Sequence, residues 1–375
     1  MRALVSLAAC SDYGYSTVVT AIEQALTPLG GLGVYVHRGD RVLLKPNLLY
    51  GRHPDKAVTT HPAVVKAIAE LVLAEGGIPV IGDSPGMGTF PRAADAAGLA
   101  AIARELDCNL ISFDDAVTVN VGQDYTFRQF DVARAALETD VIINLPKVKT
   151  HGMMLLTLAV KNMFGCVPGM RKAQWHLKAG INHDYFATML VELCQLMAPS
   201  LSIADGVVAM EGNGPGSGDP RRVGVIVAGA HVHAVDAAIC RVLGVAPELV
   251  PTLRVARQRG VHGAAWNDIE VAGPPLEQVA VSEFRLPRRV DVQWRLPGLV
   301  KKPLRNMMLP KPVVNPARCH ACGTCREVCP PHAISCEGGT IRIDYGRCIR
   351  CFCCQEMCPE GAISVKDTLL SRIVS

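Results

Sequence analysis

The sequence predicts an α/β protein with a largely parallel sheet and helices on both of its faces, followed by a small C-terminal α+β domain. Short apolar runs typical of buried strands alternate with helix-like segments through most of residues 1–284. Hydrophobic residues make up 49% of the chain, charged residues 19% and aromatic residues 5%, which suits a core rich in Val, Ala, Leu and Ile. Cysteines gather in two similar runs after residue 318, and this change of pattern predicts the second domain.

Strand and helix signals alternate in the first part of the chain. Gly30-Gly31 ends the first helix, Pro62 stands in the first turn of the second, and Gly76-Gly77 ends that one. We therefore expect strands at residues 2–9, 41–47, 78–81, 109–113 and 117–121, and helices at residues 15–29, 62–72 and 91–106.

The alternation continues to residue 259. Val141-Ile-Ile-Asn-Leu145 is strongly apolar, as expected for a central strand. Further strands are expected at residues 201–204 and 223–228, and helices at residues 153–164, 184–197, 233–243 and 247–259. In open parallel sheets, ligands bind beyond the carboxyl ends of the strands, so polar residues that follow strands are the candidates for a site.

The 375 residues divide into a domain at 1–284, a linker at 285–311 and a C-terminal domain at 312–375. Nine basic residues and one acidic residue lie between positions 285 and 318, among several prolines, which predicts a semi-rigid strap across the acidic body. Peripheral contact of 285–311 with a membrane or a partner stays open. The sequence contains no run of about 18 apolar residues, so no membrane span is predicted. No aromatic stacking platform accompanies the basic linker, which argues against binding of nucleic acid.

Each cysteine run has the spacing C-x2-C-x2-C-x3-C-P, which is typical of 4Fe-4S ligation. In this pattern three close thiolates hold one cluster and the fourth reaches across to the other. We therefore predict two 4Fe-4S clusters, the first held by Cys319, Cys322, Cys325 and Cys358 and the second by Cys348, Cys351, Cys354 and Cys329.

The repeat extends beyond the ligands, because Cys329-Pro-Pro-His-Ala-Ile-Ser335 aligns with Cys358-Pro-Glu-Gly-Ala-Ile-Ser364. Residues 312–368 thus resemble the bacterial two-cluster ferredoxin domain. Cys336 and Cys353 fall off the ligand spacing and are excluded as ligands. Structural zinc, which favours separated pairs of ligands, and a disulfide framework are the rival interpretations.

Several lysines follow the predicted strands of the body. Lys147, Lys149 and Thr150 crowd behind the strand at 141–145, and helical spacing from Met154 would bring Lys161 toward the same cleft. Converging lysines bind carboxylates, phosphates or sulfonates. The sequence predicts an anion site formed by Lys45, Lys147, Lys149, Thr150, Lys161 and Asn162, although solvated lysines beyond a strand are the simpler alternative.

His151 and Asp83 are the candidate proton donors, because reduction of an organic substrate consumes protons and histidine titrates near neutral pH. A divalent cation bound by Asp83, Asp205, Glu211 and Asp236 is another reading. The glycine-rich stretch 212–218 is either a flexible loop over the site or a long turn. No nucleotide fingerprint occurs, and a flavin stays open without support from any motif.

A family resemblance rests on several strand-end motifs. They are Lys45-Pro-Asn-Leu-Leu49, Thr60-His-Pro62, Gly82-Asp-Ser-Pro-Gly86, Asn144-Leu-Pro-Lys-Val-Lys-Thr-His151, Lys161-Asn-Met-Phe-Gly165, Asp205-Gly206 and Ala234-Val-Asp-Ala237. With them, residues 3–275 resemble the domain of unknown function 362 family, and the fused tail is similar to its iron-sulfur centre members. The resemblance implies a fold and an iron-sulfur context without a settled reaction.

Two functions fit these features, and the sequence does not decide whether the protein is an enzyme. The first is a ferredoxin-coupled oxidoreductase that passes electrons between its clusters and a small anionic substrate or cofactor at the strand ends. A redox partner protein or a small-molecule donor would supply the electrons. The second is a non-catalytic electron-transfer or assembly protein with a ligand- or partner-docking domain. Isolated thiols and oxygen-sensitive clusters predict a reducing, anaerobic cytoplasm.

Overall fold

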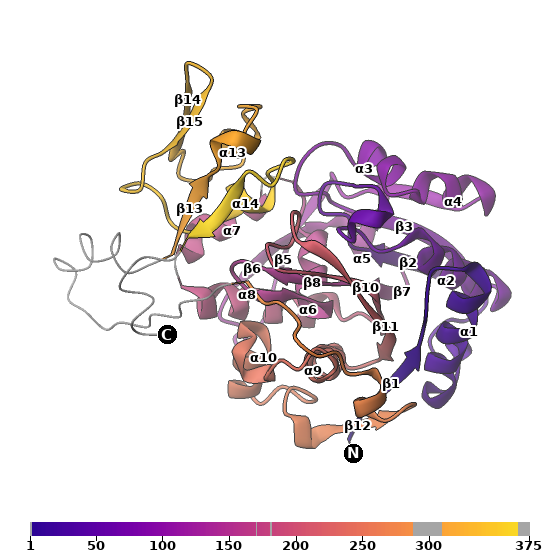
Figure 1. The fold of residues 1–375 in the computed structure, drawn as a ribbon. Coiled ribbons are helices and arrows are strands. Elements are labelled where there is room, and N and C mark those ends of the chain that lie inside the picture. Colours follow the sequence, from indigo (N-terminus) through magenta and orange to yellow (C-terminus); the bar gives the residue numbers. More distant parts are fainter. Residues whose placement is uncertain (1, 170, 181, 288–309, 367–375) are drawn as a thin grey trace.

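The computed structural model describes residues 2–169, 171–180, 182–287 and 310–366. It contains an α/β body and a smaller C-terminal domain that stands against one side of it (Figure 1). Most of the predicted linker, including Trp294, Leu299, Met307 and Met308, lies outside the described residues. At its beginning, Arg285 donates to Glu211 and Asp219 on the body.

Ten strands of the described residues form the central sheet, in the order β12-β1-β11-β10-β7-β2-β3-β4 with β8 and β9 attached beside β10. All pairings along this path are parallel except those of β11, so the largely parallel sheet is confirmed. The strands are β1 (Ala3–Ala9), β2 (Arg41–Pro46), β3 (Ile78–Asp83), β4 (Asn109–Ser112), β7 (Val141–Leu145), β8 (Lys147–His151), β9 (Leu155–Thr157), β10 (Leu201–Glu211), β11 (Asp219–Gly229) and β12 (Ile269–Ala272).

Both faces of the sheet are apolar because successive strand residues point to opposite sides. In β2, Leu43 packs into one core, while Val42 and Leu44 pack into the other. The core of Val42 and Leu44 is covered by α1 (Tyr15–Leu26), α2 (Pro62–Ala74), α3 (Phe90–Ala96) and α4 (Leu99–Glu105). The core of Leu43 is covered by α5 (Arg134–Leu137), α6 (Ala159–Asn162), α7 (Arg171–Ala179), α8 (His183–Met197), α9 (Val232–Val242), α10 (Pro251–Gln258) and α11 (Leu276–Val279).

The helix predicted at residues 153–164 is wrong. Backbone N–H groups of Met153 and Met154 donate to Nδ1 of His151, and this turn sends the chain back as β9, which pairs with β8. Only the short α6 remains helical before a 3-10 turn. The helix expected at 91–106 is split into α3 and α4 by Gly98, whose φ of 77° is left-handed. The strand expected at 117–121 is β5 (Ala116–Asn120), which pairs with β6 (Gln129–Ala133) outside the central sheet.

The C-terminal domain contains two copies of one unit. Strand β13 (Lys311–Val314), helix α13 (Thr324–Glu327) and strand β14 (Ile334–Glu337) recur as β15 (Thr340–Ile343), α14 (Cys353–Glu356) and β16 (Ile363–Lys366), at the offset that separates Cys319 from Cys348. The pairing is crossed, because β13 binds β16 and β14 binds β15. The internal duplication seen in the sequence is therefore also a structural one. None of the described helices is both long and apolar enough to span a bilayer.

Candidate functional site

A cavity of about 100 Å³ lies between the carboxyl ends of the body's strands and the C-terminal domain. The body contributes Lys45 near the end of β2, Asp83 and Ser84 at the end of β3, Lys149 of β8 and Lys161 of α6. The C-terminal domain contributes Val328, Cys353, Glu356 and Met357. Since one water molecule needs a cavity of roughly 10–15 Å³, this cavity has room for several waters or a small molecule. Five predicted site residues line it, namely Lys45, Asp83, Lys149, Lys161 and Asn162.

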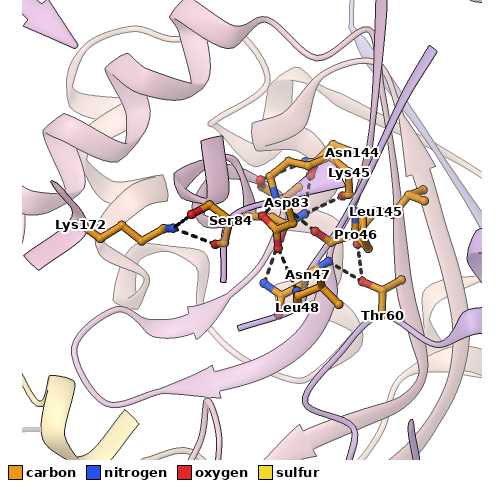
Figure 2. Close-up of polar contacts among 12 residues, drawn as sticks. Lys45, Pro46, Asn47, Leu48, Thr60, Asp83, Ser84, Asn144, Leu145 and Lys172 are labelled. Carbon is orange, nitrogen blue, oxygen red and sulfur yellow. Dashed lines mark hydrogen bonds and ion pairs between the residues drawn. The ribbon is translucent and has the colours of Figure 1, made fainter. Parts of the chain in front are cut away.

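A buried ion pair forms one wall of the cavity. Nζ of Lys45 lies 2.8 Å from Oδ1 of Asp83, and Oδ2 of Asp83 accepts from the backbone of Leu48 at 3.0 Å (Figure 2). Gly165 lies so close that a Cβ atom there would be 2.1 Å from Oδ1 of Asp83 and 2.5 Å from Nζ of Lys45. Asp83 is thus engaged as an acceptor, which disfavours the predicted role of proton donor.

Three further lysines bring positive charge to the cavity. Nζ of Lys149 donates to the carbonyl of Val58 at 2.7 Å. Nζ of Lys172 donates to the carbonyl and the hydroxyl of Ser84, as Figure 2 shows. Burial lowers the pKa of both Lys149 and Lys172 to about 7, and the charge of Lys161 adds to the effect on Lys149. Lys161 makes no direct hydrogen bond or ion pair within the part of the chain that the structure describes, so its ammonium is available to a ligand.

Two residues predicted for the anion site point elsewhere. Nζ of Lys147 lies 2.8 Å from Oδ2 of Asp205 and donates to the hydroxyl of Tyr13 at 2.6 Å. Oγ1 of Thr150 accepts from the backbone of Gly214 at 3.2 Å. Neither residue is among those that line the cavity. Because β8 is a strand and not a helix or loop, its successive side chains diverge, which separates Thr150 and Lys149.

His151 joins the body to the C-terminal domain. Its Nδ1 accepts from two backbone N–H groups, so the neutral ring carries its proton on Nε2, which lies 3.4 Å from Oε1 of Glu356. Burial, followed by the charge of Lys161, lowers the pKa of His151 to about 4. Burial alone would raise the pKa of Glu356, but the contact with His151 and the charge of Lys161 hold it well below its usual value. The carboxylate therefore faces a neutral imidazole and an ammonium.

The four carboxylates proposed as cation ligands have separate partners. Asp205 pairs with Lys147, Glu211 with Arg285, and Asp83 with Lys45. Asp236 accepts from the backbone of Ala159 and Val160 at the start of α6. Within the described residues, no group of three or more His, Cys, Asp or Glu side chains is arranged around a single metal ion. These carboxylates do not share one site.

The glycine-rich stretch 212–218 is where the two domains meet. Nε2 of Gln355 donates to the carbonyls of Asn213 and Gly214 and to Oδ1 of Asn213, at 2.9–3.1 Å. Oγ of Ser217 donates to the carbonyl of Cys358, and Pro215 lines the cavity. The stretch is thus a docking segment, which accounts for glycines where α14 approaches its backbone: a Cβ on Gly216 would lie 2.6 Å from the carbonyl oxygen of Glu356.

Cysteines of the C-terminal domain lie close together in the structure. A small cavity is lined by Cys319, Cys322, Cys325 and Cys358, the four predicted ligands of the first cluster. Burial, followed by the charges of Cys358, Cys319 and Cys322, raises the pKa of Cys325 to about 11. Burial also raises the pKa of Cys329, and the neighbouring charges of Cys351 and Cys348 add to this effect. Sγ of Cys329 and Sγ of Cys358 each accept from a backbone N–H four residues on, at 3.2 Å. These thiolate sets and amide donors fit 4Fe-4S clusters.

Comparison with known proteins identifies the family of the chain. A model of the domain of unknown function 362 (DUF362) family matches residues 42–241, which is more than half of the chain. The chain belongs to the DUF362 family. A 4Fe-4S dicluster domain model matches residues 311–359, so this DUF362 member is an iron-sulfur protein. Both resemblances seen in the sequence are confirmed.

One curated relative is a thylakoid-associated protein of Synechocystis sp., which is 38% identical over 306 residues, covering 81% of this chain and 94% of the relative. Among solved structures, the lactate racemase apoprotein from Thermoanaerobacterium thermosaccharolyticum matches with a TM-score of 0.40 at 10% identity, over 64% of this chain and 57% of that one.

Sequence reasoning missed the contribution of the ferredoxin domain to the DUF362 cavity. The two copies of the repeat differ at the relevant helix: Arg326 and Glu327 of α13 are exposed, while their counterparts Gln355 and Glu356 of α14 are buried. Cys353 replaces Thr324 of the first copy. Apolar or uncharged residues at solvent-facing positions of one copy were a readable signal that this copy docks. Lys172 of α7 was also missed, because the polar segment around it gave no signal of burial.

Proposed function

We propose that the protein is a ferredoxin-coupled oxidoreductase that binds a small organic anion in the cavity between its two domains. The observation that carries this proposal is that α14 lines the same cavity as the lysines. Cys353 and Glu356 of α14 share it with Lys149 and Lys161. A ligand held by these lysines would therefore lie against the helix that also bears Cys354, a predicted ligand of the second cluster.

The reaction class is a two-electron, two-proton reduction of the bound anion, or its reverse. A 4Fe-4S cluster exchanges single electrons, so the two predicted clusters together supply the pair. The electrons come from an external one-electron donor, and the protons come from solvent through groups at the cavity. Cys322 is exposed and Cys319 is half-buried, whereas the predicted ligands of the second cluster are all buried. This difference supports entry of electrons on the outer side of the domain.

Lys161 is our candidate for proton transfer to the substrate. Of the two candidates from the sequence, Asp83 is an acceptor for Lys45, and His151 is kept neutral and turned toward Glu356. Lys161 carries N–H groups without a direct partner among the described residues, and burial lowers its pKa. An ammonium with a lowered pKa releases a proton more readily than one with the ordinary pKa of lysine. The contact between His151 and Glu356 holds the Glu356 carboxylate in place, and its negative charge acts on the Lys161 ammonium.

The non-catalytic carrier remains the alternative function. The exposed Cys322 suits both functions, because each exchanges electrons with a partner. A carrier, however, has no need for a lysine-lined cavity behind its inner cluster. A cytoplasmic, anaerobic setting is part of the proposal. The name of the Synechocystis relative mentions thylakoid association, so a location at a membrane surface, with contact through residues 285–311, is the competing proposal.

The test uses the full chain reconstituted anaerobically and reduced with a slight deficit of dithionite. Oxo and α,β-unsaturated carboxylates such as pyruvate, hydroxypyruvate and acrylate are then added, and reoxidation is followed by the visible absorbance of the clusters. We expect at least one acid of the panel to reoxidise the protein, and the double variant Lys149→Ala, Lys161→Ala to be slower by about tenfold or more, as expected for loss of charged contacts of about 1.5–3 kcal/mol.

Lys56→Ala serves as the matched control, since Lys56 is exposed and away from the cavity. Iron content is measured for every variant, so that loss of clusters is not mistaken for loss of binding. If all acids of the panel leave the reduced clusters unchanged, or if the double variant reacts as fast as the wild type at equal iron content, the oxidoreductase proposal fails and the carrier function is favoured.

A further inference from the structure

Three buried polar atoms around the cavity lack a partner. They are Oδ1 of Asn47, Oγ1 of Thr157 and Nδ1 of His176, and none of them has a hydrogen bond in the part of the chain that the structure describes. All three residues line the cavity, and they come from different elements. Most buried polar atoms in proteins are hydrogen-bonded, so a concentration of unpaired atoms at one cavity points to a ligand that pairs with them. Their chemistry therefore constrains what that ligand is.

A relay of three asparagines fixes the polarity of Asn47. Nδ2 of Asn144 donates to the carbonyl of Ala159 at 3.0 Å, and Nδ2 of Asn162 donates to the carbonyl of Lys45 at 3.1 Å. Because a carbonyl only accepts, these two contacts decide which end of each amide is the NH2 group. Nδ2 of Asn162 also donates to Oδ1 of Asn144 at 2.8 Å.

The relay ends at the cavity with an acceptor. Oδ1 of Asn162 is left to face Asn47, whose Nδ2 donates to it at 2.9 Å. The remaining atom of Asn47, Oδ1, is therefore a fixed hydrogen-bond acceptor that cannot be exchanged for a donor by turning the amide. Figure 2 shows Asn47 and Asn144 beside the ion pair of Lys45 and Asp83. Only an O–H or N–H group of the ligand pairs with this atom.

Three lysines on the other walls are donors. Lys161 offers its ammonium, and Lys149 and Lys172 each bind neutral oxygens of the chain, so their charges are not cancelled by a direct ion pair. Glu356 is the carboxylate of the C-terminal domain that lines the cavity, and it stands beside His151. An anionic oxygen of the ligand thus has cations to bind, while Asn47 calls for a second, different group.

We propose that the ligand is a small carboxylate that also carries a hydroxyl or amide N–H, bound at two points, with the donor group on Oδ1 of Asn47 and the carboxylate on the lysines. This inference rests on the proposed function and specifies its substrate class. An acid without such a donor leaves the Asn47 oxygen buried and unpaired, which costs binding free energy.

The test measures binding of matched acids to the oxidised, iron-loaded full chain by calorimetry at constant ionic strength and pH. The pairs are glycolate against acetate, oxamate against pyruvate, and mandelate against phenylacetate, in which the first member adds an O–H or N–H donor. We expect the donor-bearing member of at least one pair to bind about tenfold more tightly. The hydroxyl pairs and the amide pair distinguish the two sources of the donor.

The variant Asn47→Leu should bind both members of that pair alike, because the acceptor is gone while the lysines remain. Asn120→Leu, the same substitution at an exposed asparagine outside the cavity, should keep the preference. Iron content and circular dichroism confirm that each variant is folded. Equal binding of all pairs by the wild type, or a preference that survives in Asn47→Leu, overturns this inference and leaves the anion site standing. Absence of binding by every acid overturns both the inference and the proposed function.

Discussion

Oε1 of Glu356 lies 3.4 Å from Nε2 of His151, and this contact links the second cysteine run to the strand that follows β7. Glu356 is also the carboxylate whose charge faces Lys161. Replacing it by Gln keeps the shape but leaves the half-buried ammonium of Lys161 without its counter-charge. We predict that Glu356→Gln lowers the free energy of unfolding by about 1–3 kcal/mol, measured by anaerobic denaturation at equal iron content.

The duplication supplies the control for this variant. Glu327 occupies the position equivalent to Glu356 in the first copy and is exposed. Glu327→Gln should change the free energy of unfolding by less than about 0.5 kcal/mol. Equal effects of the two variants would show that the charge of Glu356 has no special role.

His176 gives a prediction about pH. Burial lowers its pKa to about 3, from an ordinary value of about 6.5, so the unfolded chain binds a proton between these pH values that the folded protein does not. The stability contributed by the neutral ring is present above pH 6.5 and is lost as the pH falls from there. His176→Phe, which keeps the ring beside Phe164 and Phe186, should flatten the fall in stability between pH 6.5 and about 5 by up to about 1.4 kcal/mol per pH unit.

That slope is obtained from denaturation curves of wild type and variant at each pH, with iron content followed in parallel, since clusters are lost in acid. A variant at an exposed histidine, His53→Phe, should leave the slope as it is. The same slope in His176→Phe as in the wild type contradicts the assignment of a neutral buried ring.

The crossed ligand assignment predicts which cluster each cysteine serves. Cys358→Ser should remove the first cluster, although Cys358 belongs to the second run, and Cys329→Ser should remove the second. Cys353→Ser should retain the full content of about eight irons. The measurement is iron and sulfide content together with the spin coupling between reduced clusters in electron paramagnetic resonance. Loss of iron in Cys353→Ser would reassign that thiol as a ligand.

Gly165 predicts a steric effect on the wall of the cavity. A Cβ at this position would lie 2.1 Å from Oδ1 of Asp83, so Gly165→Ala must displace the ion pair with Lys45. Breaking a buried pair of this kind costs about 3–5 kcal/mol, and we expect a corresponding loss in the free energy of unfolding. Gly122→Ala is the matched control, because a Cβ there meets nothing within 4 Å. A tolerated Gly165→Ala would mean that the pair can shift without cost.

Much of the fold followed from local signals. Glycines, the first-turn proline and the apolar run at 141–145 placed strands and helices of the sheet close to their true bounds. The cysteine spacing gave the duplication, and the motifs gave the family. These features are visible in the sequence because each depends on residues that are near one another in the chain.

The site was harder to predict because it depends on distant residues. Lys147 and Lys149 look equivalent in the sequence, but Asp205 and Tyr13 bind only the first, and no local pattern reveals that pairing. The hairpin of β8 and β9 arises from a turn capped by His151, which helical periodicity at 153–164 concealed. The contribution of α14 depended on how two domains dock, which spacing within one domain does not encode.

Helix α14 carries both Cys354, a predicted cluster ligand, and Cys353 and Glu356 on the wall of the cavity. Small ferredoxin domains depend on their clusters for folding, because few other core residues are available, and here half of the buried residues in the domain's core cluster are cysteines. Iron starvation or oxygen damage would then disrupt the cavity wall formed by α14 together with the predicted clusters. Under the proposed function, an iron-poor protein would release the bound anion instead of holding it unreacted.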